Sequence, residues 1–239
     1  VAIVIPVYNI APYLNECLDS ILTQTYANFT VFAVDDGSTD ESGAILDEWT
    51  TKDTRFIVIR QKNGGLSAAR NAALDLIERD GTFEYVAFVD SDDKVLPEFL
   101  ALLVQNAVQT QADITACGFF KFNDEGRTKT EGVIQTARTI DQEEFVELIF
   151  SRLRWDKTCG AGGMVWEKLF TASSIKSIRF PSNRDVLEDE IFCLQAALRA
   201  QIFSYLPKML YGYRQRPNSI IRSERFAWQM FKGRALCVD

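Results

Sequence analysis

Short apolar runs alternate with helical patterns along the first 90 residues, and this alternation restricts the possible folds more than any other feature. The apolar runs are rich in β-branched residues, and they predict strands at Val1–Val7, Phe29–Val34, Arg55–Ile59 and Tyr85–Val89. The helical patterns between them lie near Pro12–Leu22, Ala44–Trp49 and Leu66–Ile77. Strands that are separated by helices pair in parallel through right-handed crossovers. We therefore predict an α/β fold with an open, mostly parallel, twisted sheet and helices on both faces.

The second half of the chain is less regular. A helix is predicted near Leu96–Gln109, and strands near Asp113–Phe122 and Thr128–Ile134 indicate a small antiparallel addition to the sheet. Further helices are expected from Asp141 and over Glu188–Ala200. C-terminal helices complete the predicted domain.

Polar residues follow three of the predicted strands where each strand ends. These segments are Pro6-Val7-Tyr8-Asn9, Asp35-Asp36-Gly37-Ser38 and Asp90-Ser91-Asp92-Asp93. In an open parallel sheet, ligands bind outside the carboxyl ends of the strands. We therefore expect the three segments to converge on one cleft.

The segment after the fourth strand carries three acids within four residues, Asp90, Asp92 and Asp93. Carboxylates this close repel one another and are tolerated mainly where a cation neutralises them, and oxygen ligands suit Mg²⁺ or Mn²⁺. The run therefore predicts a metal site that holds a diphosphate. An acidic turn that caps the next helix is the alternative, because Asp and Ser favour such positions.

The sequence contains no histidine. Imidazole bases, Ser-His-Asp and Cys-His pairs and the common zinc sites are therefore excluded, and acid–base chemistry falls to carboxylates, Lys, Tyr or Cys. The five cysteines are scattered and never form Cys-x-x-Cys, which indicates reduced apolar fillers and a cytoplasmic, reducing compartment. The net charge of -7 argues against a nucleic-acid partner.

The charge is unevenly distributed along the chain. Residues 199–239 carry eight Lys or Arg against two acids. A basic segment of this kind can bind a diphosphate or make peripheral contact with the inner face of an anionic membrane, and a solvated basic helix is the alternative. No apolar run approaches the ~20 residues that a bilayer span needs.

Several motifs of the first half occur in a fixed order. They are Pro6-Val7-Tyr8-Asn9, Ser20-Ile21-Leu22-Thr23-Gln24-Thr25-Tyr26, Val34-Asp35-Asp36-Gly37-Ser38-Thr39-Asp40, Asn63-Gly64-Gly65-Leu66-Ser67-Ala68-Ala69-Arg70-Asn71 and Phe88-Val89-Asp90-Ser91-Asp92-Asp93. As a set, they resemble the family two glycosyltransferases, which have the GT-A fold and use nucleotide-sugar donors.

Matches continue in the second half of the chain. They are Trp166-Glu167-Lys168-Leu169-Phe170, Arg179-Phe180-Pro181, Glu188-Asp189-Glu190 and Tyr213-Arg214-Gln215-Arg216-Pro217-Asn218-Ser219-Ile220. These segments resemble the acceptor-side half of bacterial members that build surface polysaccharides.

The resemblance implies a division of labour within one domain. Residues 1–110 would bind the donor, and residues 111–239 would form the acceptor-side half with a helical C-terminal segment. The donor would be a nucleotide sugar, with a UDP-sugar expected, and the acceptor would be a hydroxyl of a saccharide or a lipid-linked molecule. The sequence leaves the donor sugar, the acceptor, the linkage and the oligomeric state open.

The resemblance implies that the first two strand ends bind the nucleobase of the donor. Asp36 would accept a hydrogen bond from the base, Tyr8 would lie beside its ring, and the backbone of Pro6 and Val7 would line its edge. A carboxylate can accept from the N–H of uracil, which favours UDP. An Asx-turn at Asp36 and a packed core aromatic at Tyr8 are the alternatives.

A glycine-containing turn precedes the helix at Leu66. Free N–H groups at a helix start can bind phosphate or ribose oxygens, so Asn63 and Gly65 are candidate donor ligands, although the glycines can also serve the turn alone. The resemblance implies that Arg70, within this helix, faces the donor site and fixes its carboxylates. A surface or salt-bridging arginine is the alternative.

Asp90 and Asp92 would form the Asp-x-Asp motif of the family. The resemblance implies that Asp92 ligates Mn²⁺ or Mg²⁺, while Asp90 contacts the ribose or the metal shell and Ser91 lies at the donor between them. A divalent cation stabilises the charge of a departing diphosphate. Asp93 is predicted instead to begin the next helix.

The resemblance points to Asp189 as the catalytic base. Transfer with inversion requires a group that deprotonates the acceptor hydroxyl as it attacks, and a carboxylate can do this. Glu188 and Glu190 flank this residue, and their like charges are expected to raise its pKa toward a useful value. An acidic helix N-terminus, favoured by the helix dipole, is the alternative.

Arg214 and Arg216 are predicted to close over the diphosphate of the donor as a lid, since guanidinium groups bind phosphate oxygens well. A structural role for both is the alternative. Trp166 is expected to pack in the core, with stacking on an acceptor sugar as the alternative.

Together these features predict a metal-dependent inverting glycosyltransferase of polysaccharide or glycolipid synthesis. One alternative is a sugar nucleotidyltransferase, which would usually carry a Gly-rich basic loop after the first strand, where this chain has Pro6-Val7-Tyr8-Asn9-Ile10. The other is a catalytically silent sugar-nucleotide-binding module. The presence of both Asp92 and Asp189 argues against it.

Overall fold

The computed structural model describes residues 1–131, 137–150, 162–182 and 187–216. In these segments the strands are β1 (Ala2–Val7), β2 (Thr30–Asp35), β3 (Phe56–Arg60), β4 (Tyr85–Phe88), β5 (Lys94–Val95), β6 (Ile114–Asn123), β7 (Gly126–Glu131), β8 (Arg138–Ile140), β9 (Lys168–Thr171) and β10 (Phe203–Arg214). The helices are α1 (Ala11–Leu22), α2 (Ser42–Lys52), α3 (Leu66–Asp80), α4 (Phe99–Thr110), α5 (Gln142–Phe150) and α6 (Glu188–Ala197). The elements predicted for the first 110 residues are present, with small differences at their ends.

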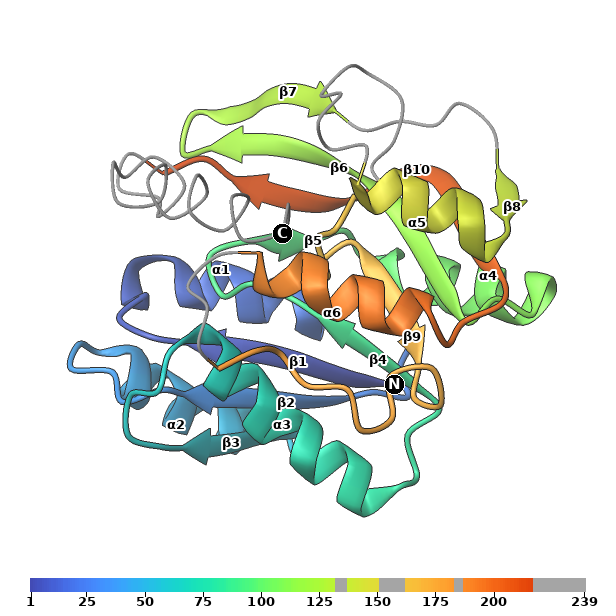
Figure 1. The fold of residues 1–239 in the computed structure, drawn as a ribbon. Coiled ribbons are helices and arrows are strands. Elements are labelled where there is room, and N and C mark those ends of the chain that lie inside the picture. Colours follow the sequence, from blue (N-terminus) through green and yellow to red (C-terminus); the bar gives the residue numbers. More distant parts are fainter. Residues whose placement is uncertain (132–136, 151–161, 183–186, 217–239) are drawn as a thin grey trace.

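One sheet runs through the described residues in the order β3-β2-β1-β4-β9-β6-β10-β5, with β7 beside β6 and β8 beside β10 (Figure 1). The strands β1 to β4 pair in parallel, as predicted. A second parallel pair joins β10 to β6. β9 lies between the two groups and pairs antiparallel with both β4 and β6. β7 pairs antiparallel with β6, which confirms the predicted antiparallel addition.

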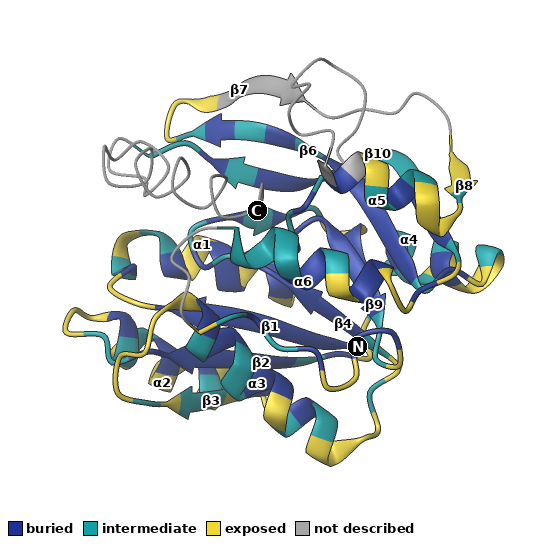
Figure 2. Cartoon of the chain, in the orientation of Figure 1, coloured by how far each residue is buried: buried dark blue, intermediate teal, exposed yellow. Residues whose placement is uncertain are grey.

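Helices cover both faces of the sheet, also as predicted. Alternate residues of β1 point to opposite faces, so that Ile3 and Ile5 join one hydrophobic core and Ala2 and Val4 join the other. The first core packs against α1, α2 and α4, and the second packs against α3, α5 and α6. Figure 2 shows the resulting pattern, in which the central strands are buried and the outer helix faces are exposed.

A proline lies inside the central strand β1, where it would ordinarily interrupt a ladder. The last pair between β1 and β4 is Val4 with Phe88, and Val89 N–H donates to Val4 O at 3.0 Å. Backbone groups point alternately to the two neighbouring strands, so the nitrogen of Pro6 points toward β4, as the carbonyl of Val4 does. The missing N–H of Pro6 therefore falls where pairing with β4 has already ended. Pairing with β2 continues to Val7.

The strand β10 corrects the interpretation of the basic segment, for which the sequence pattern predicts no strand and allows a helix. Aromatic residues alternate at Phe203 and Tyr205 and again at Tyr211 and Tyr213, which is typical of a strand. Pro207 interrupts this alternation, because proline is uncommon inside a strand. The register against β6 shifts between Leu206 and Met209, so the proline lies at an irregularity of the ladder. The C-terminal helices predicted beyond α6 fall on residues 217–239, outside the described residues.

The described cysteines agree with the prediction of apolar fillers, because Cys17, Cys117 and Cys193 are free and buried. Cys159 and Cys237 lie outside the described residues. No helix in the described part of the chain is both long and apolar enough to cross a membrane.

Phe192 on α6 tests how the second core holds this helix. The ring is fully buried and stacks on Phe180, with ring centroids 4.2 Å apart. We predict that Phe192→Ala lowers the free energy of unfolding by ~3–5 kcal/mol, because it leaves a cavity. Leu198, just after the same helix, is 64% exposed, so Leu198→Ala should change it by less than ~0.5 kcal/mol. Urea denaturation measures both variants, and equal effects would contradict the packing.

Candidate active site

The three polar segments predicted to converge lie at one edge of the sheet, which we call the rim (residues 6–9, 35–38 and 90–93). β1 and β2 end together, with Val7 paired to Asp35, and Asp36 N–H donates to Val7 O at 2.9 Å. β4 flanks β1 on the other side and runs in the same direction, so the acidic segment begins at the same edge.

Asp36 holds the turn that precedes α3. Its carboxylate is buried and accepts hydrogen bonds from Gln61 Nε2 at 2.7 Å, Gly64 N–H at 2.9 Å and Gly65 N–H at 2.8 Å. Gly65 has φ of 89°, a conformation that favours glycine. The Asx-type hydrogen bond of this strand end belongs instead to Asp35, which accepts from Ser38 N–H at 2.9 Å. A contact of Asp36 with a nucleotide base stays a prediction, and the carboxylate retains acceptor capacity for it.

Tyr8 is 50% exposed at the rim, so it is not a packed core aromatic. Pro6 and Val7 beneath it are buried. Asn63 is exposed and lies close to the second strand end, because a Cβ placed on Gly37 would meet its backbone nitrogen at 2.9 Å. These four predicted donor residues therefore lie around one edge of the sheet.

Asp93 does not begin a helix, and this prediction is wrong. The residue is fully buried and its carboxylate accepts hydrogen bonds from Tyr211 Oη–H at 2.8 Å and Arg214 N–H at 2.7 Å. Tyr211 Oη also accepts from Asp90 N–H at 3.1 Å. Burial raises the pKa of Asp93 well above its usual range, and the neighbouring Asp92 and Asp90 add to the effect. Asp93 thus fastens the acidic loop (residues 90–93) to β10, a role that requires the strand missed in the sequence.

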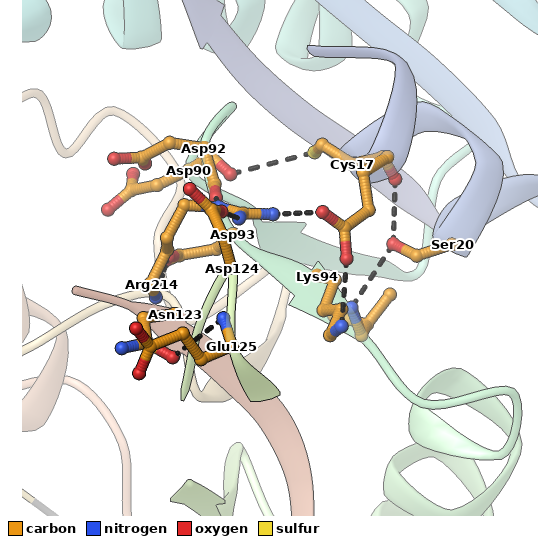
Figure 3. A network of polar contacts seen from close by, with 12 residues as sticks. Cys17, Ser20, Asp90, Asp92, Asp93, Lys94, Asn123, Asp124, Glu125 and Arg214 are labelled. Carbon is orange, nitrogen blue, oxygen red and sulfur yellow. Dashed lines mark hydrogen bonds and ion pairs between the residues drawn. The ribbon is translucent and has the colours of Figure 1, made fainter. Parts of the chain in front are cut away.

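Arg214 is the second fastening of the acidic loop, and it is not the mobile lid residue predicted. It lies in β10, is 4% exposed, and donates from Nε to Asp92 O at 2.8 Å. Its other nitrogens bind Asp124 Oδ1 at 2.8 Å and the carboxylate of Glu16 on α1. Figure 3 shows the guanidinium within this network, beside the Asp90–Asp93 turn. A buried guanidinium with three protein partners supports the loop rather than closing over a ligand.

Arg70 on α3 brings two distant carboxylates together. Its Nη2 lies 2.9 Å from Asp90 Oδ1, and its Nη1 lies 2.5 Å from Asp189 Oδ1 on α6. The side chain of Arg70 is only 1% exposed, so it is not a surface arginine. Asp189 binds Arg70 rather than the amides of its own helix, which disfavours a purely capping role. The N-terminus of α6 therefore lies beside the rim, as a base for chemistry at the acidic loop requires.

Negative charge exceeds positive charge around Arg70. Glu188 Oε1 lies 4.0 Å from Arg70 Nη1, so that one guanidinium faces three carboxylates. Burial raises the pKa of Glu188 to about 7, and the adjacent Asp189 adds to the shift. Burial likewise raises the pKa of Asp90 to about 6, against the attraction of Arg70. This shift belongs to Glu188, a neighbour of the proposed base, and the expected shift of the base itself stays a prediction.

Asp92 points its carboxylate toward Arg216, with Arg216 Nε 2.6 Å from Asp92 Oδ2. Ser91 between the two acids is buried. Among the described residues, no three Asp, Glu, Cys or His side chains form a complete metal site. The carboxylate oxygens of Asp90 and Asp92 nevertheless suit Mg²⁺ or Mn²⁺, which often use one or two carboxylates and take further ligands from substrate phosphates and water. These residues fit a divalent cation that binds together with a diphosphate.

Trp166 packs in the core, as expected. It is 5% exposed and stacks against Tyr211 and Tyr213, with ring centroids 4.6 and 5.5 Å apart. The predicted motif after Arg216 continues into residues 217–220, which lie outside the described residues. The same holds for most of the basic segment and for its predicted membrane contact.

Two glycosyltransferases are similar in sequence to this chain over most of its length. It is 34% identical over 226 residues to the uncharacterized glycosyltransferase EpsJ of Bacillus subtilis (strain 168), and the match covers 92% of this chain and 62% of that protein. It is 35% identical over 234 residues to the glycosyltransferase GlyA of Streptococcus pneumoniae serotype 4, and that match covers 95% of this chain and 32% of that protein. The chain therefore spans less than two thirds of the length of these relatives.

A solved structure has the same fold. The crystal structure of S. aureus TarS 1-349 in complex with UDP-GlcNAc aligns with 96% of this chain and 64% of its own, with a TM-score of 0.75 and 25% identity. This confirms the predicted GT-A architecture. The family model of glycosyl transferase family 2 matches residues 2–165. With these matches and the acidic rim described above, the chain belongs to glycosyl transferase family 2.

Proposed function

We propose that this chain is a metal-dependent inverting glycosyltransferase that uses a UDP-sugar donor, with Asp189 as the base. The observation that carries the proposal is the position of Asp189, which shares Arg70 with Asp90 of the acidic loop at 2.5 and 2.9 Å. A single guanidinium thus separates the proposed base from the proposed donor site. General-base catalysis needs such proximity before any tuning of acidity.

The proposed reaction is one displacement. The acceptor hydroxyl oxygen forms a bond to the anomeric carbon of the donor sugar, and its proton passes to the Asp189 carboxylate. The bond from the anomeric carbon to the diphosphate breaks at the same time, and its electron pair leaves on the diphosphate oxygen. Because attack and departure occur on opposite faces, the anomeric configuration inverts.

The proposed donor site comprises the rim and the turn before α3. Tyr8 offers an exposed ring for the base, Pro6 and Val7 line the strand end, and Asp36 offers its remaining acceptor capacity to a uracil N–H. Asn63 and Gly65 lie in the turn before α3, and because the Gly65 N–H is held by Asp36, we assign the anionic oxygens to the following N–H groups in the first turn of α3. UDP-GlcNAc in the related TarS structure supports a uridine donor.

Asp92 and Asp90 would hold the divalent cation in this proposal. When bound, Mn²⁺ or Mg²⁺ would stabilise the negative charge of the departing diphosphate. Arg216, 2.6 Å from Asp92 and 24% exposed, would contact phosphate oxygens in this proposal. Ser91 and Arg70 would complete the site, and Arg214 would support it from below through the Asp92 backbone. A mannosyltransferase from Pyrobaculum calidifontis with the same fold was solved with GDP-Man and Mn²⁺, which is consistent with a cation here.

The acceptor side is proposed on broader grounds. We infer that residues 1–110 bind the donor and residues 111–239 face a saccharide or lipid-linked acceptor in polysaccharide or glycolipid synthesis, as the resemblance implies. A cytoplasmic location, with the basic C-terminal segment near the inner membrane face, belongs to the same proposal. A sugar nucleotidyltransferase is disfavoured by the family match and a silent binding module by the placement of Asp189.

The donor and metal are tested together by thermal shift. We predict that UDP with Mn²⁺ raises Tm more than GDP, CDP or ADP with Mn²⁺, and that UDP alone raises it weakly. Asp92→Ala should abolish the metal-dependent part, because the carboxylate is the proposed ligand. Asp19→Ala, at an exposed acid of α1, is the control and should respond as the wild type does. Equal shifts from all nucleotides would refute the uridine donor.

The role of Asp189 as catalytic base is tested by measuring the release of UDP from UDP-sugars in the absence of acceptor, when water is the attacking hydroxyl. We predict that Asp189→Asn slows release by about 10²–10⁴-fold while its UDP–Mn²⁺ thermal shift stays unchanged, because the carboxylate acts on the attacking hydroxyl. Glu188→Gln is the neighbouring control and should retain most of the rate. A fast Asp189→Asn together with a slow Glu188→Gln would transfer the role to Glu188. No release from the wild type with any UDP-sugar would favour the silent module.

The charge excess around Arg70 predicts a pH dependence of stability. A carboxyl whose pKa is raised to about 7 in the folded state binds its proton more tightly there than when unfolded. The resulting penalty is absent below its ordinary pKa near 4.5 and complete above about 7. We therefore predict that Glu188→Gln is more stable than the wild type at pH 8, by ~2 kcal/mol, and that the difference disappears near pH 4.5. The charged groups that face Glu188, which are Arg70, Asp189 and Asp90, are all retained in the Glu188→Gln variant.

Denaturation at several pH values measures this difference. Glu147→Gln, at an exposed position of α5, is the matched control and should show no such trend. A stability difference that does not change between pH 4.5 and 8 would contradict the assignment.

A further inference from the structure

A fully buried lysine lies behind the proposed base. Lys168 begins β9, and its side chain is 0% exposed. Its ammonium donates to Gly162 O at 2.8 Å, to Met164 O at 2.7 Å and to Glu167 Oε1 at 2.9 Å. These contacts use all three N–H groups of the ammonium. Two of the three acceptors are main-chain carbonyls of one short segment, residues 162–165.

This segment packs directly against α6. A Cβ on Gly163 would overlap Glu190 Cγ and would lie 3.1 Å from Glu190 Cα, so a larger residue at this position would require α6 or the Glu190 side chain to shift. Cys193 Sγ, one turn after Asp189, donates to Met164 O at 3.6 Å. The segment therefore fixes the position of the first turns of α6.

One peptide group connects Lys168 with Asp189. The carbonyl of Met164 accepts from Lys168 Nζ, and the N–H of the same peptide, at Val165, points to Asp189 Oδ2 at 3.4 Å. The peptide dipole is thus aligned between a cation at its oxygen and a carboxylate at its N–H. A cation at the carbonyl oxygen polarises the peptide and strengthens its N–H as a donor.

Stability alone gives a poor reason for this arrangement. Burial of a lysine–glutamate pair costs desolvation that its attraction often only offsets, and an apolar side chain of similar volume can stabilise such a site equally well. What an apolar residue cannot do is orient the two carbonyls of the 162–165 segment. The charge at position 168 therefore has a use in placing the peptide that faces Asp189.

We propose that Lys168 is a positioning residue for the transfer reaction, which orients and polarises the Met164–Val165 peptide toward the Asp189 carboxylate. On this view, Arg70 holds one oxygen of Asp189 and the Val165 N–H holds the other. The free lone pairs of the carboxylate are then directed to the acceptor hydroxyl. The inference rests on the proposed function only for its kinetic consequence, because the peptide contact itself can be observed in the absence of turnover.

The kinetic test compares Lys168→Met, Lys168→Arg and the exposed control Lys176→Met. We expect Lys168→Met to lower kcat for UDP release roughly tenfold, the effect of a charge-assisted hydrogen bond, with the donor KM and the UDP–Mn²⁺ thermal shift unchanged. Lys168→Arg, which keeps charge and donors, should recover part of the rate, and Lys176→Met should match the wild type. An unchanged kcat, or equal losses of kcat and of UDP affinity, would overturn the proposal.

A second measurement reads the contact itself. Hydrogen exchange at the Val165 amide should accelerate at least tenfold in Lys168→Met, while amides of β1 keep their protection. In the chain with Lys168 intact, the Val165 amide proton resonance should move upfield on Asp189→Asn, a readout that remains if Lys168→Met does not fold. An amide indifferent to Asp189 would overturn the proposal. A responsive amide with Asp189→Asn still active would preserve the contact and refute the proposed function instead.

Discussion

The pairing of Arg70 with Asp90 and Asp189 is the interaction on which the organisation of the site depends. It joins α3, the loop after β4 and the start of α6. Arg70 and Asp189 are more than a hundred residues apart in the sequence. A guanidinium that is 1% exposed could not remain there unpaired, because an isolated buried charge is strongly unfavourable. Folding of the two halves of the chain is therefore coupled through the same group that brings the proposed base to the rim.

The acidic loop shows how a crowded group of carboxylates is tolerated. Asp93 turns inward to Tyr211 and the backbone of Arg214, Asp90 turns to Arg70, and Asp92 turns to Arg216. Each acid thus has its own hydrogen-bond donor or cation from a separate position in the chain. Repulsion between them is relieved by divergence rather than by protonation alone, and two of the three sets of partners come from residues 211–216.

The first half of the fold and its rim could be predicted because each strand end there is local in sequence. The polar residues follow their strands directly, and parallel pairing then collects them at one edge. β10 could not be predicted in the same way, since Pro207 breaks its alternation of aromatic residues at a ladder irregularity. Without β10, the inward role of Asp93 and the supporting role of Arg214 were invisible, because both depend on contacts across more than a hundred residues.

The separate partners of the three acids limit how far the length of the acidic loop can vary. Asp93 is fixed to β10 at one end and β4 ends at Phe88 on the other, so only a few residues connect two immobile points. One residue inserted between Asp90 and Asp93 would draw Asp90 away from Arg70 or Asp93 away from Tyr211, so that a buried group would lose its partner. The spacing between Asp90 and Asp93 is therefore set by where α3 and β10 lie in the fold.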